Sequence, residues 1–123
     1  MKESRKEVVL WGTGTPTRDL LYVEDAANSL ICALKSESNA SPINIGSEKE
    51  VSIKELAETI RKVIGEDFEL KWDTTKPDGQ PRRMLDTSRV EKEIGFKAEV
   101  GLNEGLKKTI EWYKKSLSSN DFC

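Results

Sequence analysis

Two loops carry the residues whose types and spacing could do chemistry. The first, WGTGTPTR at 11–18, places two glycines ahead of an arginine. Glycine lets a backbone approach an anion closely, and the planar guanidinium of Arg18 suits two-point contact with a phosphate. The spacing matches neither the phosphate-binding GxxxxGK[ST] loop nor the dinucleotide-binding GxGxxG loop. From these residues alone, a solvated turn is the simpler interpretation, and Trp11 is either a core residue or a flat surface for a base or sugar.

The second loop, KPDGQPRRMLD at 76–86, concentrates charge in an irregular stretch. Its prolines and glycine prevent regular pairing, so we expect Lys76, Arg82 and Arg83 to be displayed at the surface, where they could clamp an anion. Asp78 could accept hydrogen bonds from a diol or an amine, as carboxylates do from sugar hydroxyls. The alternative role for Asp78 is that of a turn residue ahead of a glycine.

Catalytic and metal-binding residues are scarce. The chain has no histidine, and therefore no imidazole base for neutral pH. Neither Tyr22 nor Tyr113 is followed four residues later by a lysine, so the Tyr-x-x-x-Lys arrangement for proton transfer is missing. Glu24 and Asp25 would point in different directions on a helix, and we expect Cys32 to be a buried, inert side chain. The sequence predicts no catalytic, cofactor-binding or metal site in this chain.

The elements that must position the loops form an α/β layer with a small sheet. Apolar runs predict about three strands, at 7–11, 43–46 and 68–72, with an extended segment at 20–23. Apolar residues at three- and four-residue spacing predict about four helices, near 23–34, 53–64, 88–94 and 102–113. Two capping boxes support them, Ser52 with Glu55 and Ser88 with Glu91, and Asp86 is expected to help cap the third helix. We expect one domain over 7–115, with flexible ends at 1–6 and 116–123.

Composition narrows the class of protein. Twenty basic and twenty-two acidic side chains in 123 residues give a formal charge of -2, so no overall field would attract nucleic acid or an anionic membrane. No apolar run approaches the ~18 residues of a membrane span, and the first residues lack the apolar stretch of a signal peptide. Cys32 and Cys123 have no disulfide-framework spacing. We therefore expect a soluble, cytoplasmic protein that binds neither nucleic acid nor membrane.

Four segments, in a fixed order, carry a family resemblance. They are VVLWGTGTPTRDLLYVEDAA, INIGSEKEVSIKELAETI, TKPDGQPRRMLDTSRV, and IGF followed by GLNEGLKKTIEWY. Together they resemble the C-terminal part of the GDP-L-fucose synthase family of extended short-chain dehydrogenases/reductases, over roughly residues 7–115. The W-G-x-G-x-P-x-R and K-P-D-G-x-P-R segments are fairly specific to that family, whereas R-D-x-x-x-V-x-D and E-G-L-x-x-T-x-x-W are shared by many nucleotide-sugar epimerases and dehydratases.

The resemblance implies a substrate-binding lobe. In the family, a Rossmann domain supplies the NADP site and catalysis, and the smaller lobe closes over a GDP-sugar during conversion of GDP-4-keto-6-deoxymannose to GDP-L-fucose. By resemblance, Trp11, Arg18 and Asp78 match substrate-contacting residues, and Lys76 and Arg83 match the same motif more loosely. The family's cofactor fingerprint and its catalytic tyrosine, lysine, cysteine and histidine belong to a part that this chain lacks. We therefore expect no nicotinamide binding and no redox step by the chain alone.

Three interpretations stay open. The chain is a separated GDP-sugar-binding lobe with millimolar affinity at best, because half of the pocket would be missing. Alternatively, it is an interaction module that pairs with a separate Rossmann chain or with itself. In the third interpretation, it is the substrate lobe of another nucleotide-sugar epimerase or dehydratase. All three predict an apolar patch, around Trp11 and residues 20–23, that is exposed or buried in a homo-oligomer.

Overall fold

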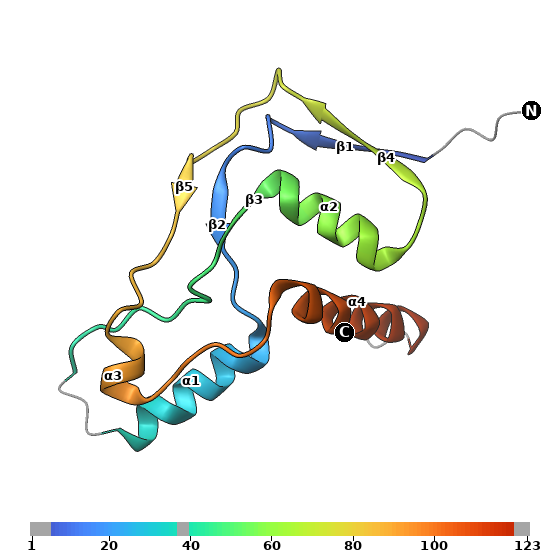
Figure 1. Ribbon diagram of the computed structural model, residues 1–123. Coiled ribbons are helices and arrows are strands. Elements are labelled where there is room, and N and C mark those ends of the chain that lie inside the picture. The colour runs from blue at the N-terminus through green and yellow to red at the C-terminus, as the bar shows by residue number, and fades with distance from the viewer. Residues whose placement is uncertain (1–5, 37–39, 120–123) are drawn as a thin grey trace, which may run out of the picture.

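The computed structural model describes residues 6–36 and 40–119, and these form an open α/β arrangement (Figure 1). The α/β class and the number of predicted helices are confirmed, but the strands form two small sheets rather than one. Predicted strand 7–11 is β1, and predicted strand 68–72 is β4. The elements in chain order are β1 (Lys6–Trp11), β2 (Thr17–Asp19), α1 (Val23–Lys35), β3 (Glu50–Ser52), α2 (Ile53–Ile64), β4 (Phe68–Asp73), β5 (Arg82–Arg83), α3 (Val90–Ile94) and α4 (Leu102–Ser119).

The first sheet is a parallel pair, β1 with β4, in register from Lys6 opposite Phe68 to Trp11 opposite Asp73. The alternation predicted for β4 is present, since Phe68, Leu70 and Trp72 are partly buried and the residues between them are exposed. One face of β4 lies against α2 (Figure 1). Because the strands are parallel, the loops that leave their carboxyl ends start from the same edge of the sheet.

The second sheet has β2 in the middle, antiparallel to β3 and parallel to β5. The prediction of a strand at 43–46 is wrong, because this segment is irregular and pairs with no strand of the described chain. An extended run needs a neighbouring backbone to become a strand, and here Ile43 and Ile45 pack their side chains on α3 instead. The extended segment expected at 20–23 forms no strand, but Tyr22 has extended backbone angles, and Val23 already begins α1.

A side-chain cap begins α2 but not α3. Ser52 caps α2 as predicted, its Oγ accepting from the Glu55 N–H at 3.1 Å. The second predicted capping box does not form, since α3 begins without a side-chain cap. Asp86 instead accepts the Ser88 N–H at 3.0 Å, which closes a turn just ahead of α3.

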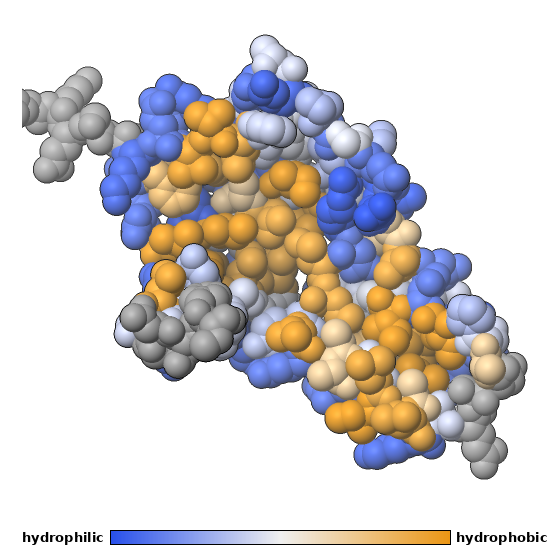
Figure 2. Space-filling model, turned by 180° about the vertical axis from the view of Figure 1, so that it is seen from behind, coloured by the Kyte–Doolittle hydropathy of each residue, from blue (hydrophilic) through white to orange (hydrophobic). Residues whose placement is uncertain are grey.

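Helix α1 buries two polar side chains and exposes its large aliphatic ones. Asp25 and Ser29 are 4% and 1% exposed, whereas Leu30 and Leu34 are 63% and 86% exposed. Asp25 is buried because its Oδ2 accepts the N–H groups of Glu99 and Val100, at 3.1 and 2.9 Å, from the segment that leads to α4. Apolar residues gather over the end of the molecule that α1 forms (Figure 2).

The buried core is small and lies between α1 and α3. Val90, Ile94 and Phe96 form its buried centre, and Leu21, Cys32, Ala33, Ile43, Ile45 and Ala98 pack around it. Cys32 is therefore only partly buried. Within residues 6–36 and 40–119, no helix is long and apolar enough to cross a bilayer.

Two elements extend into the predicted ends. Lys6 is the first residue of β1, and α4 continues to Ser119. In this last part of α4, the Ser118 hydroxyl donates to the Lys114 carbonyl at 2.8 Å. The predicted ends at 1–5 and 120–123 lie outside the described residues, and so does Cys123.

Candidate functional site

The two glycine- and charge-rich segments of the sequence form loops 12–16, between β1 and β2, and 74–81, between β4 and β5, and these loops lie side by side. They leave the carboxyl ends of β1 and β4, where the Gly12 N–H donates to the Asp73 carbonyl at 2.9 Å. They converge again at the second sheet, where the Thr17 N–H donates to the Pro81 carbonyl at 3.0 Å. All five predicted site residues, Trp11, Arg18, Lys76, Asp78 and Arg83, lie on these loops or on the strands that border them (Figure 1). The carboxyl edge of parallel strands is a common place for ligand sites in α/β proteins.

The first loop does hold an anion, and that anion is Asp78. The Asp78 carboxylate accepts the Thr13 N–H at 2.6 Å and the Thr13 hydroxyl at 2.8 Å. Gly12 makes the approach possible, because a Cβ at this position would lie 2.3 Å from Asp78 Oδ1 and its φ is +84°. The Thr13 backbone N–H, followed by the Thr13 hydroxyl, holds the pKa of Asp78 below its ordinary value of 3.8.

The rest of the first loop is held by contacts with β4 and with the start of α2. Gly14 sits on the Trp72 ring, where a Cβ would come within 2.6 Å of the indole carbons. The carbonyls of Gly14 and Pro16 accept the N–H groups of Lys54 and Ile53, each at 2.9 Å. The loop therefore occupies donors in the first turn of α2 that the helix itself cannot satisfy.

Two arginines stand next to each other on the second sheet. Arg18 of β2 pairs in register with Arg83 of β5, and both contact Gln80. The Arg18 Nη1 donates to the Gln80 carbonyl at 2.9 Å and to the Thr17 carbonyl at 2.7 Å, while the Arg83 Nε donates to Gln80 Oε1 at 3.0 Å. Among the described residues, neither arginine forms an ion pair with a carboxylate.

Trp11 is at the surface rather than in the core, with 70% of its area exposed. The Lys76 ammonium lies 5.6 Å from the centre of its ring, within range of a cation–π contact. An exposed indole next to a cation can stack on a flat or hydroxylated ligand and contact a negative charge at the same time.

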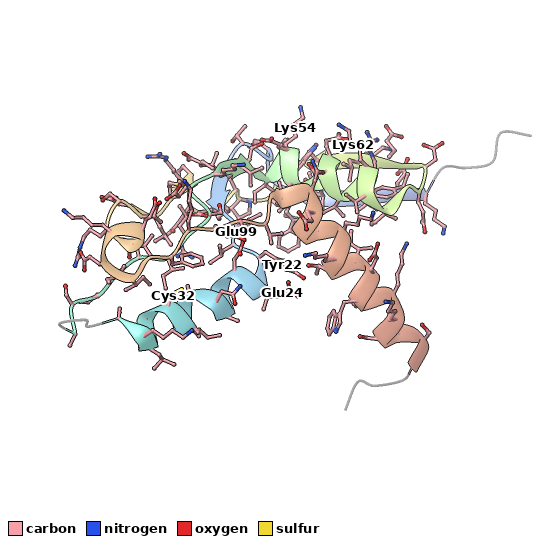
Figure 3. The ribbon with its side chains drawn as sticks, turned by 60° about the horizontal axis from the view of Figure 1, so that its bottom comes forward. Tyr22, Glu24, Cys32, Lys54, Lys62 and Glu99 are labelled. Carbon is pink, nitrogen blue, oxygen red and sulfur yellow. The ribbon has the colours of Figure 1, made fainter. Side chains whose placement is uncertain are left out.

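Two hollows lie elsewhere on the molecule. The larger, of about 960 Å³, is an apolar groove between the residues before α1 and the helices α2 and α4. Figure 3 shows Tyr22 and Glu24 at its α1 side, where the Lys108 ammonium lies 3.9 Å from the Glu24 carboxylate. The smaller, of about 400 Å³, lies between the segments that precede β3 and α4. None of the five predicted site residues lines either hollow, so they form an exposed ledge rather than a closed pocket.

Thr13 and Gln80 are the residues of this ledge that sequence reasoning missed. Thr13 supplies both donors to Asp78, and Gln80 joins the two arginines. Neither residue type distinguishes itself in a loop rich in polar residues, so the sequence offered no signal for them. Across residues 6–36 and 40–119, no group of three metal-ligating side chains comes together.

Comparison with known proteins identifies a family and several relatives of this chain. Residues 1–46 match the NAD dependent epimerase/dehydratase family. Over 92% of its length, the chain is 45% identical to a probable GDP-L-fucose synthase 1 of Oryza sativa subsp. japonica, of which it covers 34%. This chain is a relative of the GDP-L-fucose synthases. The resemblance inferred from the sequence is thus confirmed, and the chain spans about a third of the length of the curated relatives it matches.

Solved structures show the same fold in other sugar-nucleotide enzymes. A UDP-glucose 4-epimerase of Thermotoga maritima, solved with UDP-glucose, superposes with a TM-score of 0.81 at 28% identity, covering 90% of this chain and 36% of the epimerase. A GDP-6-OMe-4-keto-L-xylo-heptose reductase of Campylobacter jejuni superposes with a TM-score of 0.80 at 31% identity, covering 90% of this chain and 34% of the reductase. The GDP-L-fucose synthase relative therefore has the fold of about one third of such enzymes.

Proposed function

We propose that this chain is the substrate-binding lobe of a GDP-L-fucose synthase-like epimerase/reductase, corresponding to its C-terminal part, and that the ledge binds a GDP-sugar. The observation that carries the proposal is the register pairing of Arg18 with Arg83, two cations side by side without a carboxylate partner in the described chain. Residues paired across neighbouring strands project from the same face of a sheet, with the strands about 4.8 Å apart. Like charges so placed repel, and a diphosphate that bridges them removes that cost.

Other arginines of the described chain, including the adjacent Arg82, have a carboxylate partner that Arg18 and Arg83 lack. Arg82 also lies on β5, but its Nε and Nη2 donate to the Glu50 carboxylate at 2.7 and 2.9 Å. Arg61 and Arg89 are neutralised in the same way, by Glu58 and Glu93. Arg18 and Arg83 therefore differ from three other arginines of the described chain in having carboxylate-free guanidinium groups that a ligand can use.

The remaining ledge residues complete the assignment. Arg18 and Arg83 contact the diphosphate, Lys76 adds a third cation, and Trp11 offers its face to the sugar or the base. Asp78 lies between these groups on the second loop. NADP and the groups that catalyse epimerisation and reduction belong to the other two thirds of the enzyme, so the lobe alone is inactive.

Titration of the isotopically labelled chain with GDP-mannose, followed by NMR, tests the proposal. We expect millimolar affinity, because a lone lobe leaves much of the ligand in water. Arg18→Gln and Arg83→Gln should each weaken binding roughly fivefold, about 1 kcal/mol for a lost charge-assisted hydrogen bond. Arg61→Gln removes the same charge on α2, outside the ledge, and should leave binding unchanged.

The opposite results are equally informative. Submicromolar binding, or equal weakening by all three variants, would contradict a half-pocket centred on Arg18 and Arg83. Competition among GDP-, UDP- and dTDP-sugars measures nucleotide preference. A preference for uracil or thymine would assign the lobe to another nucleotide-sugar epimerase or dehydratase.

A second candidate function, an interaction module, is favoured by the exposed apolar face of α1. Val23, Leu30 and Leu34 recur along this helix and are all more than 60% exposed. Aligned enzymes contain about twice as much additional chain, and a dinucleotide-binding domain within it is the occupant that we propose for this face. The two functions are compatible, because the ledge and the α1 face involve different residues.

A further inference from the structure

The contact between Asp78 and loop 12–16 is a small hydrogen-bonded network with a defined direction. Thr13 uses its single hydroxyl proton to donate to Asp78 Oδ2. Its oxygen can then only accept, from the Thr15 hydroxyl at 2.7 Å and the Thr15 N–H at 3.3 Å. The Thr15 hydroxyl therefore donates to Thr13, and the Thr13 hydroxyl donates to Asp78. Each oxygen of the Asp78 carboxylate accepts one hydrogen bond from the first loop.

This network joins the middle of the two loops, in addition to the Thr17–Pro81 contact at their far end. At their base, the Asp73 carbonyl accepts the N–H groups of Gly12 and Lys76, at 2.9 and 3.2 Å. Trp11 immediately precedes Gly12 on one loop, and Lys76 is two residues before Asp78 on the other. The distance between the Trp11 ring and the Lys76 ammonium therefore depends on how the loops are held together.

We propose that Asp78 is a positioning residue of the sugar-nucleotide ledge, which closes loop 74–81 onto loop 12–16 through Thr13 and so holds Trp11 and Lys76 in place for the ligand. The inference rests on the proposed function for the identity of the ligand. It differs from the direct substrate contact that the family resemblance implies for Asp78, because one acceptor site on each oxygen of its carboxylate is already used by Thr13.

Two further observations support a built contact. The positive φ of Gly12 and the absence of a side chain there admit the carboxylate, which any other residue would displace. The pKa of Asp78 is lowered first by the Thr13 N–H and then by the Thr13 hydroxyl, so the carboxylate stays charged and the hydrogen bonds stay charge-assisted at neutral pH.

Four variants of the full chain separate positioning from direct contact: Asp78→Asn, Thr13→Val, the double variant, and Thr13→Ser as the conservative control. A positioning role predicts that Asp78→Asn weakens GDP-mannose binding roughly fivefold, that Thr13→Val, which keeps the Thr13 N–H donor, weakens it less, and that the double variant is no weaker than Asp78→Asn alone. Thr13→Ser keeps the hydroxyl and should bind as the unmodified chain does. A direct contact predicts instead that Thr13→Val binds normally and Asp78→Asn does not, and that result would overturn the proposal.

A structural readout keeps the test independent of ligand binding. In the unmodified chain, we expect nuclear Overhauser contacts between the Trp11 ring and the Lys76 side chain, and a downfield Thr13 amide proton. Asp78→Asn should abolish the contacts and move the amide proton upfield, whereas Thr13→Val should only weaken the contacts because the Thr13 N–H donor remains. Thermal unfolding checks that each variant is folded. If GDP-mannose fails to bind the unmodified chain but these signals change as expected, the proposed function fails and the loop junction stands. If the signals do not change in folded variants, the junction itself is refuted.

Discussion

At the scale of single residues, the chemistry of the first loop was recognisable but its partner was not. Two glycines ahead of an arginine indicated close approach to an anion, and the structure contains such an approach. The anion is the carboxylate of Asp78, which lies 65 positions away from Thr13 in the chain. Arg18 also has a structural task, since it holds the Gln80 carbonyl while leaving its other nitrogens available. Residues that hold the ledge together and residues that we propose as ligand contacts are thus interleaved.

Glu50 provides a pH-dependent prediction at this scale. Its carboxylate joins the three strands of the second sheet by accepting from Arg82 of β5 and Thr17 of β2. These bonds, that of Arg82 foremost, lower the pKa of Glu50 from 4.5 to about 2. Because the folded pKa is the lower one, the interaction stabilises the fold fully above pH 4.5, and this contribution is lost as the pH falls toward about 2.

We therefore expect Glu50→Gln to lower the urea midpoint at pH 7 and to approach the unmodified chain as the pH falls from 4.5 to about 2. Denaturation at several pH values measures the difference, and NMR titration of the carboxyl carbon measures the pKa directly. Glu66→Gln, at an exposed position, is the control that should show no such convergence. A Glu50 titration near 4.5 would contradict the assignment.

At the scale of elements, periodicity located the helices but not their orientation. The apolar residues of α1 do share one face, as predicted, but that face points outward because Asp25 and Ser29 are required inside. The segment 43–46 has the composition of a strand and lacks a neighbouring strand in the described chain. In both cases the local sequence pattern was identified correctly. The final structure depended on which backbone groups lay close enough to form hydrogen bonds with the segment.

Asp25 should be the residue that joins α1 to the start of α4. Asp25→Ala leaves the Glu99 and Val100 N–H groups without their acceptor, so we expect a loss of about 2 kcal/mol in the free energy of unfolding. Neighbouring Glu24→Ala, at an exposed position, should cost less than about 1 kcal/mol. Urea denaturation of both variants measures the difference. Equal effects would show that the buried carboxylate does not join the two segments.

At the scale of the whole molecule, the buried core is small and the exposed apolar surface is extensive. The outward face of α1 and the exposed Trp112 of α4 lie on a chain that covers about a third of its relatives. A surface of this kind usually marks an interface. This surface is the observation on which the proposed association with the remainder of a GDP-L-fucose synthase-like enzyme depends.

We expect the chain to bind an apolar dye and to associate with the separately produced remainder of a GDP-L-fucose synthase. Leu30→Lys and Leu34→Lys should each weaken this association at least tenfold, as loss of a buried anchor does, whereas Leu85→Lys should not. Arg18→Gln should leave it unchanged, because the ledge is separate. Sedimentation that shows a dimer of this chain, abolished by the same leucine variants, would assign the face to a second copy. A monomer that binds neither dye nor partner would contradict both.

The sequence by itself determined the α/β class, the extents of α2 and β4, the loops that carry the ledge, and the relationship to GDP-L-fucose synthases. These features depend on residue types and on spacing within a few positions, which a sequence displays directly. Only the tertiary structure decided that Asp78 fills the first loop, that Arg18 and Arg83 are neighbours, and that α1 turns its apolar face outward. Those outcomes depend on contacts between residues about 65 to 75 positions apart, and such contacts follow from how the whole backbone packs.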